Sequence, residues 1–155
     1  MEAEIEQLLA DLKIDDASQR EHATQRLWEL WFNQKGLVGL EQLQRAERFV
    51  QSGEFAQAET LLTELVAELP DFAEAWNRRA VLYYVRKNFL KSAADCRQVV
   101  DLNRYHFGAW HGLGLCEANL GNYRAAIAAF REALNIQPFA LINQKLMLEC
   151  TSKLS

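Results

Sequence analysis

The feature that most constrains this chain is a residue pattern that returns every 34 positions. Trp76 and Trp110 are 34 residues apart, and Pro70 and Pro138 are 68 apart, which is two periods. Counting 34 residues back from Trp76 gives Gln42, and the residues around it keep the same order of apolar and polar positions. A fixed period of about 20 to 50 residues indicates a stack of similar structural units.

Each period predicts two helices joined by a short turn. In the last period, apolar residues recur at helical spacing on both sides of Gly121. This spacing predicts an amphipathic helix over residues 107–119 and a second one over 123–136. Gly121 and Asn122 supply the turn, and Pro138 ends the second helix because proline lacks the N–H that a helix interior needs. The two earlier periods carry equivalent residues, so we expect three such pairs in tandem.

Small residues recur where the two helices of a period must approach each other. Gly114 and Ala126 are expected at the crossing, because a larger side chain there would force the helix axes apart. Trp110, Tyr123 and Phe130 are expected to fill the space around that crossing.

Residues 39–138 resemble three tetratricopeptide repeats, which run over 39–72, 73–106 and 107–140. The pattern of that family is Trp-x2-Leu-Gly-x2-Tyr, then Ala-x3-Phe, then Pro. The third repeat departs from it at Glu117, where the family prefers an aromatic residue. Its matching residues are Trp110, Leu113, Gly114, Ala126, Phe130 and Pro138.

The resemblance implies an all-α fold, a right-handed α-solenoid of stacked helix-turn-helix repeats with about nine helices. The first helices of such repeats line a concave groove. In the family, the groove faces the second, fifth, sixth, ninth, twelfth and thirteenth positions of a repeat. The partner-binding residues that this implies are Glu47, Val50, Asn77, Arg78, Val81, Tyr84, His111, Gly112, Leu115 and Asn119.

Residues 1–37 are expected to form a helical pair that caps the solenoid, with Ser18 and Glu21 as a capping box for its second helix. The aromatic residues of that helix would cover the open edge of the first repeat. The alternative is that Trp28 or Trp31 is partly exposed and docks a partner.

Residues 139–155 are expected to form a C-terminal capping helix. Its inner face would include Leu141, Leu146 and Leu148, and its outer face would carry charged residues.

Composition argues against several classes of partner. The chain has 17 Lys and Arg against 21 Asp and Glu, so nucleic-acid binding by counterion release is not expected. No apolar run approaches the roughly 18 residues of a membrane span, and the acidic N-terminus does not resemble a signal peptide. The three widely spaced cysteines suggest buried thiols in a reducing compartment. We therefore expect a cytoplasmic protein, or the mature soluble form in an organelle.

Reactive groups do not gather anywhere in the sequence. His106 and His111 are five residues apart and do not share a helical face, and no cysteine or carboxylate completes a zinc set. No phosphate-binding loop or nucleophile motif is present. We expect no catalytic, metal or cofactor site, and hence no enzyme.

The expected function is a non-catalytic interaction module or scaffold that binds a segment of a partner protein in the groove and assists complex assembly. Tyr84 and His111 would anchor that segment, and Arg78 would meet a carboxylate. A self-associating structural protein and a small-ligand-binding regulator are the alternatives.

One known ligand of such grooves, the C-terminus of heat-shock chaperones, can be tested against the residues of this chain. Co-chaperones of this family clamp the C-terminal carboxylate of heat-shock chaperones with five Lys, Asn and Arg side chains. The matching positions here hold Leu43, Glu47, Arg78, Gly108 and Gly112. The residues therefore predict no heat-shock chaperone carboxylate clamp and no tight binding to an acidic chaperone tail.

Overall fold

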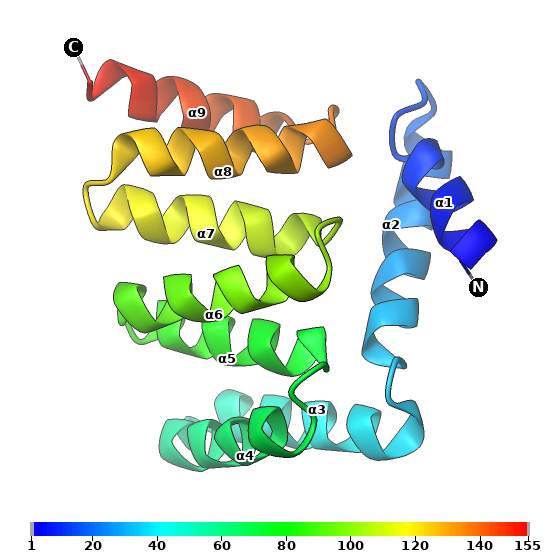
Figure 1. Cartoon of the computed structure of the whole chain (residues 1–155), viewed down its shortest axis with the longest axis vertical. Helices are drawn as coiled ribbons and strands as arrows, with labels where there is room; N and C mark the ends of the chain where they lie inside the picture. The colour runs from blue at the N-terminus through cyan, green and yellow to red at the C-terminus, as the bar shows by residue number, and fades with distance from the viewer. Residues whose placement is uncertain (1, 155) are drawn as a thin grey trace.

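A computed structural model describes residues 2–154, which form nine α-helices and no strand. The all-α prediction with about nine helices is confirmed. The helices are α1 (Glu2–Asp11), α2 (Ala17–Phe32), α3 (Gly36–Gln51), α4 (Phe55–Glu68), α5 (Ala73–Val85), α6 (Phe89–Leu102), α7 (Phe107–Asn119), α8 (Tyr123–Ile136) and α9 (Leu141–Ser152) (Figure 1).

Helices α3 to α9 stack in chain order, as the predicted solenoid requires (Figure 1). Within the stack, α3 packs on α4, α5 on α6, α7 on α8, and α9 on α8. The bounds of α7 and α8 match the predicted helices, whereas α3 begins at Gly36, three residues before the expected start of the first repeat.

Each turn inside the three helix pairs contains one residue with a positive φ angle. Gly53, Lys87 and Gly121 occupy equivalent positions 34 residues apart, and their φ angles are 75°, 61° and 80°. This left-handed conformation reverses the chain after the first helix of a pair, and glycine adopts it without steric cost. Lys87 keeps the same conformation at the middle turn despite its side chain.

The expected close crossing is present between α7 and α8. Gly114 is buried, and a Cβ built on it would lie 2.5 Å from Cε1 of Phe130. Phe130 and Ala126 are themselves fully buried. The glycine therefore lets the Phe130 ring lie directly against the backbone of α7.

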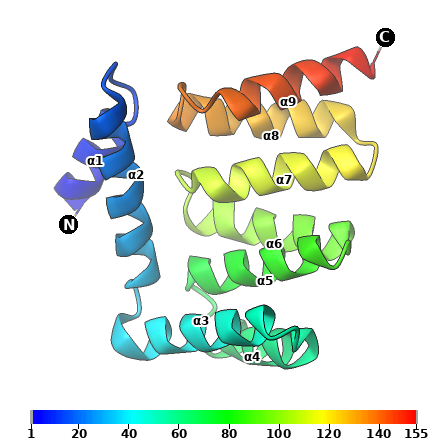
Figure 2. The same ribbon diagram turned by 180° about the vertical axis from the view of Figure 1, so that it is seen from behind.

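Helix α2 does not extend the stack but runs across the ends of the repeat helices (Figures 1 and 2). Its aromatic rings contact the start of α7, where Trp28 lies 5.4 Å from the ring centroid of Phe107. Nearer the start of α2, Thr24 accepts a hydrogen bond from Gln137. Phe32 packs against the core of the first repeat as expected, whereas Trp28 and Trp31 lie against Phe107 at the start of the third repeat.

The predicted capping box at the start of α2 is also wrong. The N-cap is Asp16, and its carboxylate accepts a hydrogen bond from the backbone N–H of Gln19 at 3.1 Å. Ser18 already lies inside the helix, so its hydroxyl is not at the capping position.

Helix α9 is rotated relative to the expected orientation. Leu141 and Leu148 are exposed, and Leu146 alone of the three expected leucines is partly buried. The buried residues are Asn143, which hydrogen-bonds His111 on α7, and Cys150, which packs with Phe130. None of the helices within residues 2–154 is long and apolar enough to cross a membrane.

Candidate functional site

A cavity of about 540 Å³ lies between α2 and α5. It brings Trp28 together with three of the residues expected to face the groove, so the two docking surfaces weighed from the sequence meet here, whereas Trp31 is buried and does not line the cavity. Its lining residues are Gln25, Trp28, Glu29 and Phe32 from α2, and Asn77, Arg78 and Val81 from α5.

The walls of this cavity, which we call the α2–α5 cavity, are aromatic on one side and aliphatic on the other. Trp28 and Phe32 are one helical turn apart, and their rings stack with centroids 5.6 Å apart. Val81 faces them from α5 and is half exposed. A partly open space between rings and a branched side chain suits an apolar side chain of a ligand.

Arg78 supplies the positive charge of the cavity. Its Nη1 donates to Oε2 of Glu47 on α3 at 3.0 Å, and its guanidinium carbon lies 4.9 Å from the ring centroid of Phe32. These two contacts hold the guanidinium between α3 and α2. About 30% of the Arg78 side chain remains exposed, so part of it faces the solvent.

The groove continues from Arg78 toward α3. Glu47, Val50, Arg78 and Val81 together line a small depression of about 30 Å³ beside the α2–α5 cavity. Two residues from each of two neighbouring repeats thus meet along one surface, as expected for the concave side.

A buried polar network lies beneath α2 and was not foreseen. His106 and Glu74 are both fully buried and share a short hydrogen bond, and the His106 ring stacks on Trp31 with centroids 4.7 Å apart. Nδ1 of His106 accepts the backbone N–H of Ala109, so its Nε2 carries the proton toward Glu74. The network joins α5, α7 and α2.

The same network changes the place of one expected groove residue. Asn77 is buried and donates its amide N–H to Oε2 of Glu74 at 3.4 Å. The sequence pattern places Glu74 and Asn77 on the concave surface, but α2 covers that surface at its N-terminal edge. No spacing in the sequence indicates this, since the contact joins residues outside the repeats to residues within them.

The expected residues of the third repeat lie apart from the α2–α5 cavity. Leu115 and Asn119 line a separate cavity of about 260 Å³ that Leu146 and Glu149 of α9 complete. His111 binds Oδ1 of Asn143 through Nδ1 at 2.7 Å. Gly112 lies beside Cys96, whose Sγ would be 3.3 Å from a Cβ at residue 112.

Tyr84 lines neither cavity. Its ring centroid lies 5.4 Å from that of Phe89, and it packs against a buried cluster whose residues come from α5, α6, α7 and α8. Its expected role as a groove anchor therefore has no support from its position.

The three cysteines are free and buried. A hydrogen bond with Cys116 and burial raise the pKa of the Cys96 thiol well above its ordinary value. A thiol in this environment is a weak nucleophile. Among residues 2–154, no group of three or more His, Cys, Asp or Glu side chains is arranged to hold a metal ion.

Comparison with known proteins gives consistent results for the repeats. Sequence profiles of the tetratricopeptide repeat match residues 43–106 and 107–140. A TPR repeat-containing protein of Rhizobium etli is 31% identical over 135 residues, which are 86% of this chain and 66% of that protein. The chain thus spans somewhat less than two thirds of this relative's length.

Solved structures share the fold at low identity. The first TPR of Spaghetti (RPAP3), bound to the HSP90 peptide SRMEEVD, superposes with a TM-score of 0.71 and 20% identity, covering 74% of this chain and 91% of that one. The second TPR domain of human RPAP3, in complex with the HSP70 peptide SGPTIEEVD, has a TM-score of 0.68 and 20% identity, covering 72% and 93%.

These structures contradict the sequence-based prediction that excluded a heat-shock chaperone partner, because domains of this fold were solved with HSP90 and HSP70 peptides. The prediction assumed that five family positions describe this groove. In the structure, Leu43 is a core residue and Gly108 lies under Trp28, so α2 contributes side chains that those positions do not represent.

Proposed function

Because this chain belongs to the tetratricopeptide repeat family, we propose that it is a non-catalytic interaction module that binds a segment of a partner protein in the groove between α2, α3 and α5. The main observation that supports this proposal is the α2–α5 cavity. It is partly open, it has apolar walls, and a charged side chain lies at its edge. These are properties of peptide-binding grooves in which one or two apolar side chains provide most of the binding energy.

The ligand class with the best support is a short acidic peptide with an apolar side chain near its C-terminus. The HSP90 and HSP70 peptides bound by the RPAP3 domains both end in Glu-Glu-Val-Asp. In this chain the apolar side chain would enter the α2–α5 cavity beside Trp28, and a carboxylate would contact the exposed part of Arg78. Assistance to the assembly of a complex belongs to the same proposal, with the peptide as the point of attachment.

Calorimetric titration of the full chain with SRMEEVD tests the ligand class. We expect micromolar binding that weakens when the peptide valine is replaced by alanine. Val81→Glu places a carboxylate in the cavity and should abolish binding, because it removes an apolar wall and repels the acidic peptide. Leu90→Glu is the matched control, since Leu90 is an exposed apolar residue on α6 outside the cavity.

A selection with a random heptapeptide library tests the module itself. Peptides enriched on the wild-type chain should bind the Leu90→Glu variant and lose binding to Val81→Glu. Failure of SRMEEVD alone removes the acidic-peptide class. If the selection enriches nothing, or enriches peptides that bind Val81→Glu as well as wild type, the groove is not the binding surface.

A further inference from the structure

Apolar side chains lie among polar ones on the outer helices at both ends of the described stack. Helices α3 and α4 form one end and α9 forms the other (Figure 1). Neither end is covered by α2, which lies along the edge of the stack (Figure 2).

At one end, α9 exposes a stripe of leucines. Leu141 and Leu148 are 66% and 64% exposed. They are seven residues apart, so they lie on the same face about 10 Å apart along the helix axis. Lys145 and Glu149 flank Leu148 and are exposed as well. The stripe thus combines two apolar side chains with one charge of each sign.

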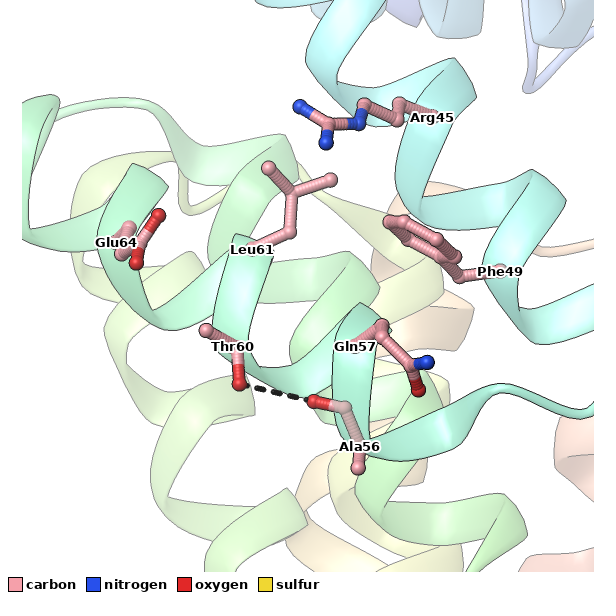
Figure 3. Close-up of a pocket in the computed structure, with 7 residues that line it drawn as sticks. All are labelled: Arg45, Phe49, Ala56, Gln57, Thr60, Leu61 and Glu64. Carbon is pink, nitrogen blue, oxygen red and sulfur yellow. Dashed lines mark hydrogen bonds between the residues drawn. The ribbon is translucent and has the colours of Figure 1, made fainter.

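At the other end, the first repeat has an open groove of about 340 Å³, whose lining residues all come from α3 and α4. Figure 3 shows Arg45 and Phe49 reaching from α3 toward Leu61 on α4. Phe49 and Leu61 are partly buried and form its apolar surface, and Arg45 and Glu64 are exposed at its rim. This groove, which we call the α3–α4 groove, also combines an apolar centre with one charge of each sign.

We propose that the α3–α4 groove binds the α9 stripe of a second copy of this chain. Leu148 of one copy would lie over Phe49 and Leu61 of the next. The charges favour this occupant, because Lys145 can then meet Glu64 and Glu149 can meet Arg45. An amphipathic helix in an apolar groove is a common mode of recognition between proteins.

The contact joins two different surfaces, and this determines the form of the assembly. A heterologous contact leaves a free α3–α4 groove at one end of every dimer and a free α9 stripe at the other, so it produces rings or open filaments. The α2–α5 cavity has no residue in common with either surface, so assembly leaves the proposed peptide site open.

Sedimentation velocity over a concentration series of the full chain tests the proposal. We expect the average mass of the wild type to rise beyond that of a dimer as concentration increases. Leu148→Glu should keep the chain monomeric, whereas the control Leu90→Glu, which changes a similarly exposed leucine elsewhere, should assemble like wild type. Glu64→Lys should weaken assembly through repulsion with Lys145, and adding Lys145→Glu to the same chain should restore it.

A mixing experiment separates this contact from a symmetric one. Leu148→Glu retains an intact α3–α4 groove, and Glu64→Lys retains an intact α9 stripe, so an equimolar mixture should form mainly dimers, with fewer larger species than the wild type at the same concentration. Circular dichroism checks that both variants are folded. A wild type that stays monomeric to its solubility limit overturns the proposal. So does assembly that Leu148→Glu leaves unchanged, or a mixture that stays monomeric while wild type assembles. Association of α9 only with a different protein would likewise reject the second copy as occupant.

Discussion

The indole of Trp28 lies so close to the backbone of Gly108 that a Cβ at residue 108 would be 2.8 Å from Cη2 of the ring. Trp28 cannot readily move away, because His106 and Phe107 hold it at centroid distances of 5.1 and 5.4 Å. Gly108 therefore allows α2 to dock on α7.

Gly108→Val should destabilise the protein by about 1–3 kcal/mol, because it overpacks this contact. Urea unfolding measures the free energy. The cost should shrink in a Trp28→Leu background, since the clash is then absent. Equal costs in the two backgrounds would mean that the valine acts through something other than Trp28.

Gly114 should tolerate a methyl group less well than Gly112, although both lie in α7. Gly→Ala in a helix interior normally gains up to about 1 kcal/mol. At residue 114 the methyl would lie 2.5–2.7 Å from three atoms of the Phe130 ring, whereas at residue 112 it would meet only Cys96 Sγ at 3.3 Å. We expect Gly114→Ala to cost about 1–3 kcal/mol and Gly112→Ala to be close to neutral in thermal or urea unfolding. Similar stabilities for the two variants would contradict the close crossing.

Arg79 and Asp95 form the ion pair that should matter most for stability. Nε and Nη2 of Arg79 donate to the two carboxylate oxygens at 2.8 and 2.9 Å, and the Asp95 side chain is only 5% exposed. Arg79→Met leaves this carboxylate unpaired and should cost about 3–5 kcal/mol.

The exposed pair between Arg26 and Glu4, each about 40% exposed, provides the comparison. Arg26→Met should cost much less than Arg79→Met, because water already solvates both groups. Chemical unfolding of the two variants side by side measures the difference, and a small loss for Arg79→Met would show that Asp95 is solvated or protonated.

Asp71 should titrate at a lower pH than an ordinary aspartate. The hydrogen bond from Lys35 Nζ, at 2.6 Å, lowers the pKa of the Asp71 carboxyl. A lowered pKa means that the folded state favours the carboxylate. The resulting stabilisation is present above the unfolded-state pKa and is lost as the pH falls through the lowered value.

An NMR titration of the carboxyl carbons checks this expectation. Lys35→Met should raise the pKa of Asp71. The pKa of Glu4, which a hydrogen bond from Arg26 lowers, should stay unchanged in the same variant. An Asp71 pKa that does not respond would show that the pair does not form in solution.

The repeats could be predicted from the sequence because their structure depends on contacts between helices that follow each other in the chain. The 34-residue period and the glycine at 121 were enough to place α7 and α8 at their observed bounds. The period does not extend to the residues before 39, so it could not predict where α2 packs. Its tryptophans indicate that the helix is packed, but nothing in their spacing says that Trp31 stacks on His106.

Contacts with helices outside the repeats also account for the parts of the site that the sequence did not reveal. Arg78 and Val81 line the α2–α5 cavity as their repeat positions suggested, while Asn77 is buried by a helix outside the repeats. In α9, hydrophobicity alone favoured Leu141 and Leu148 for the inner face. The buried residues are instead Cys150 and Asn143, and Asn143 can be buried because His111 provides a hydrogen-bond partner that a linear pattern does not show.

The hydrogen bond between Thr24 and Gln137 joins residues 113 positions apart, and it shows how α2 fastens the beginning of the chain to its last repeat. In a solenoid without such a helix, each repeat contacts only its neighbours, so the repeats at the ends can unfold one at a time. Helix α2 contacts all three repeats along one side and should prevent such separate opening. The three repeats should therefore open together in hydrogen exchange. The curvature of the solenoid should also be the same with and without a ligand in the groove.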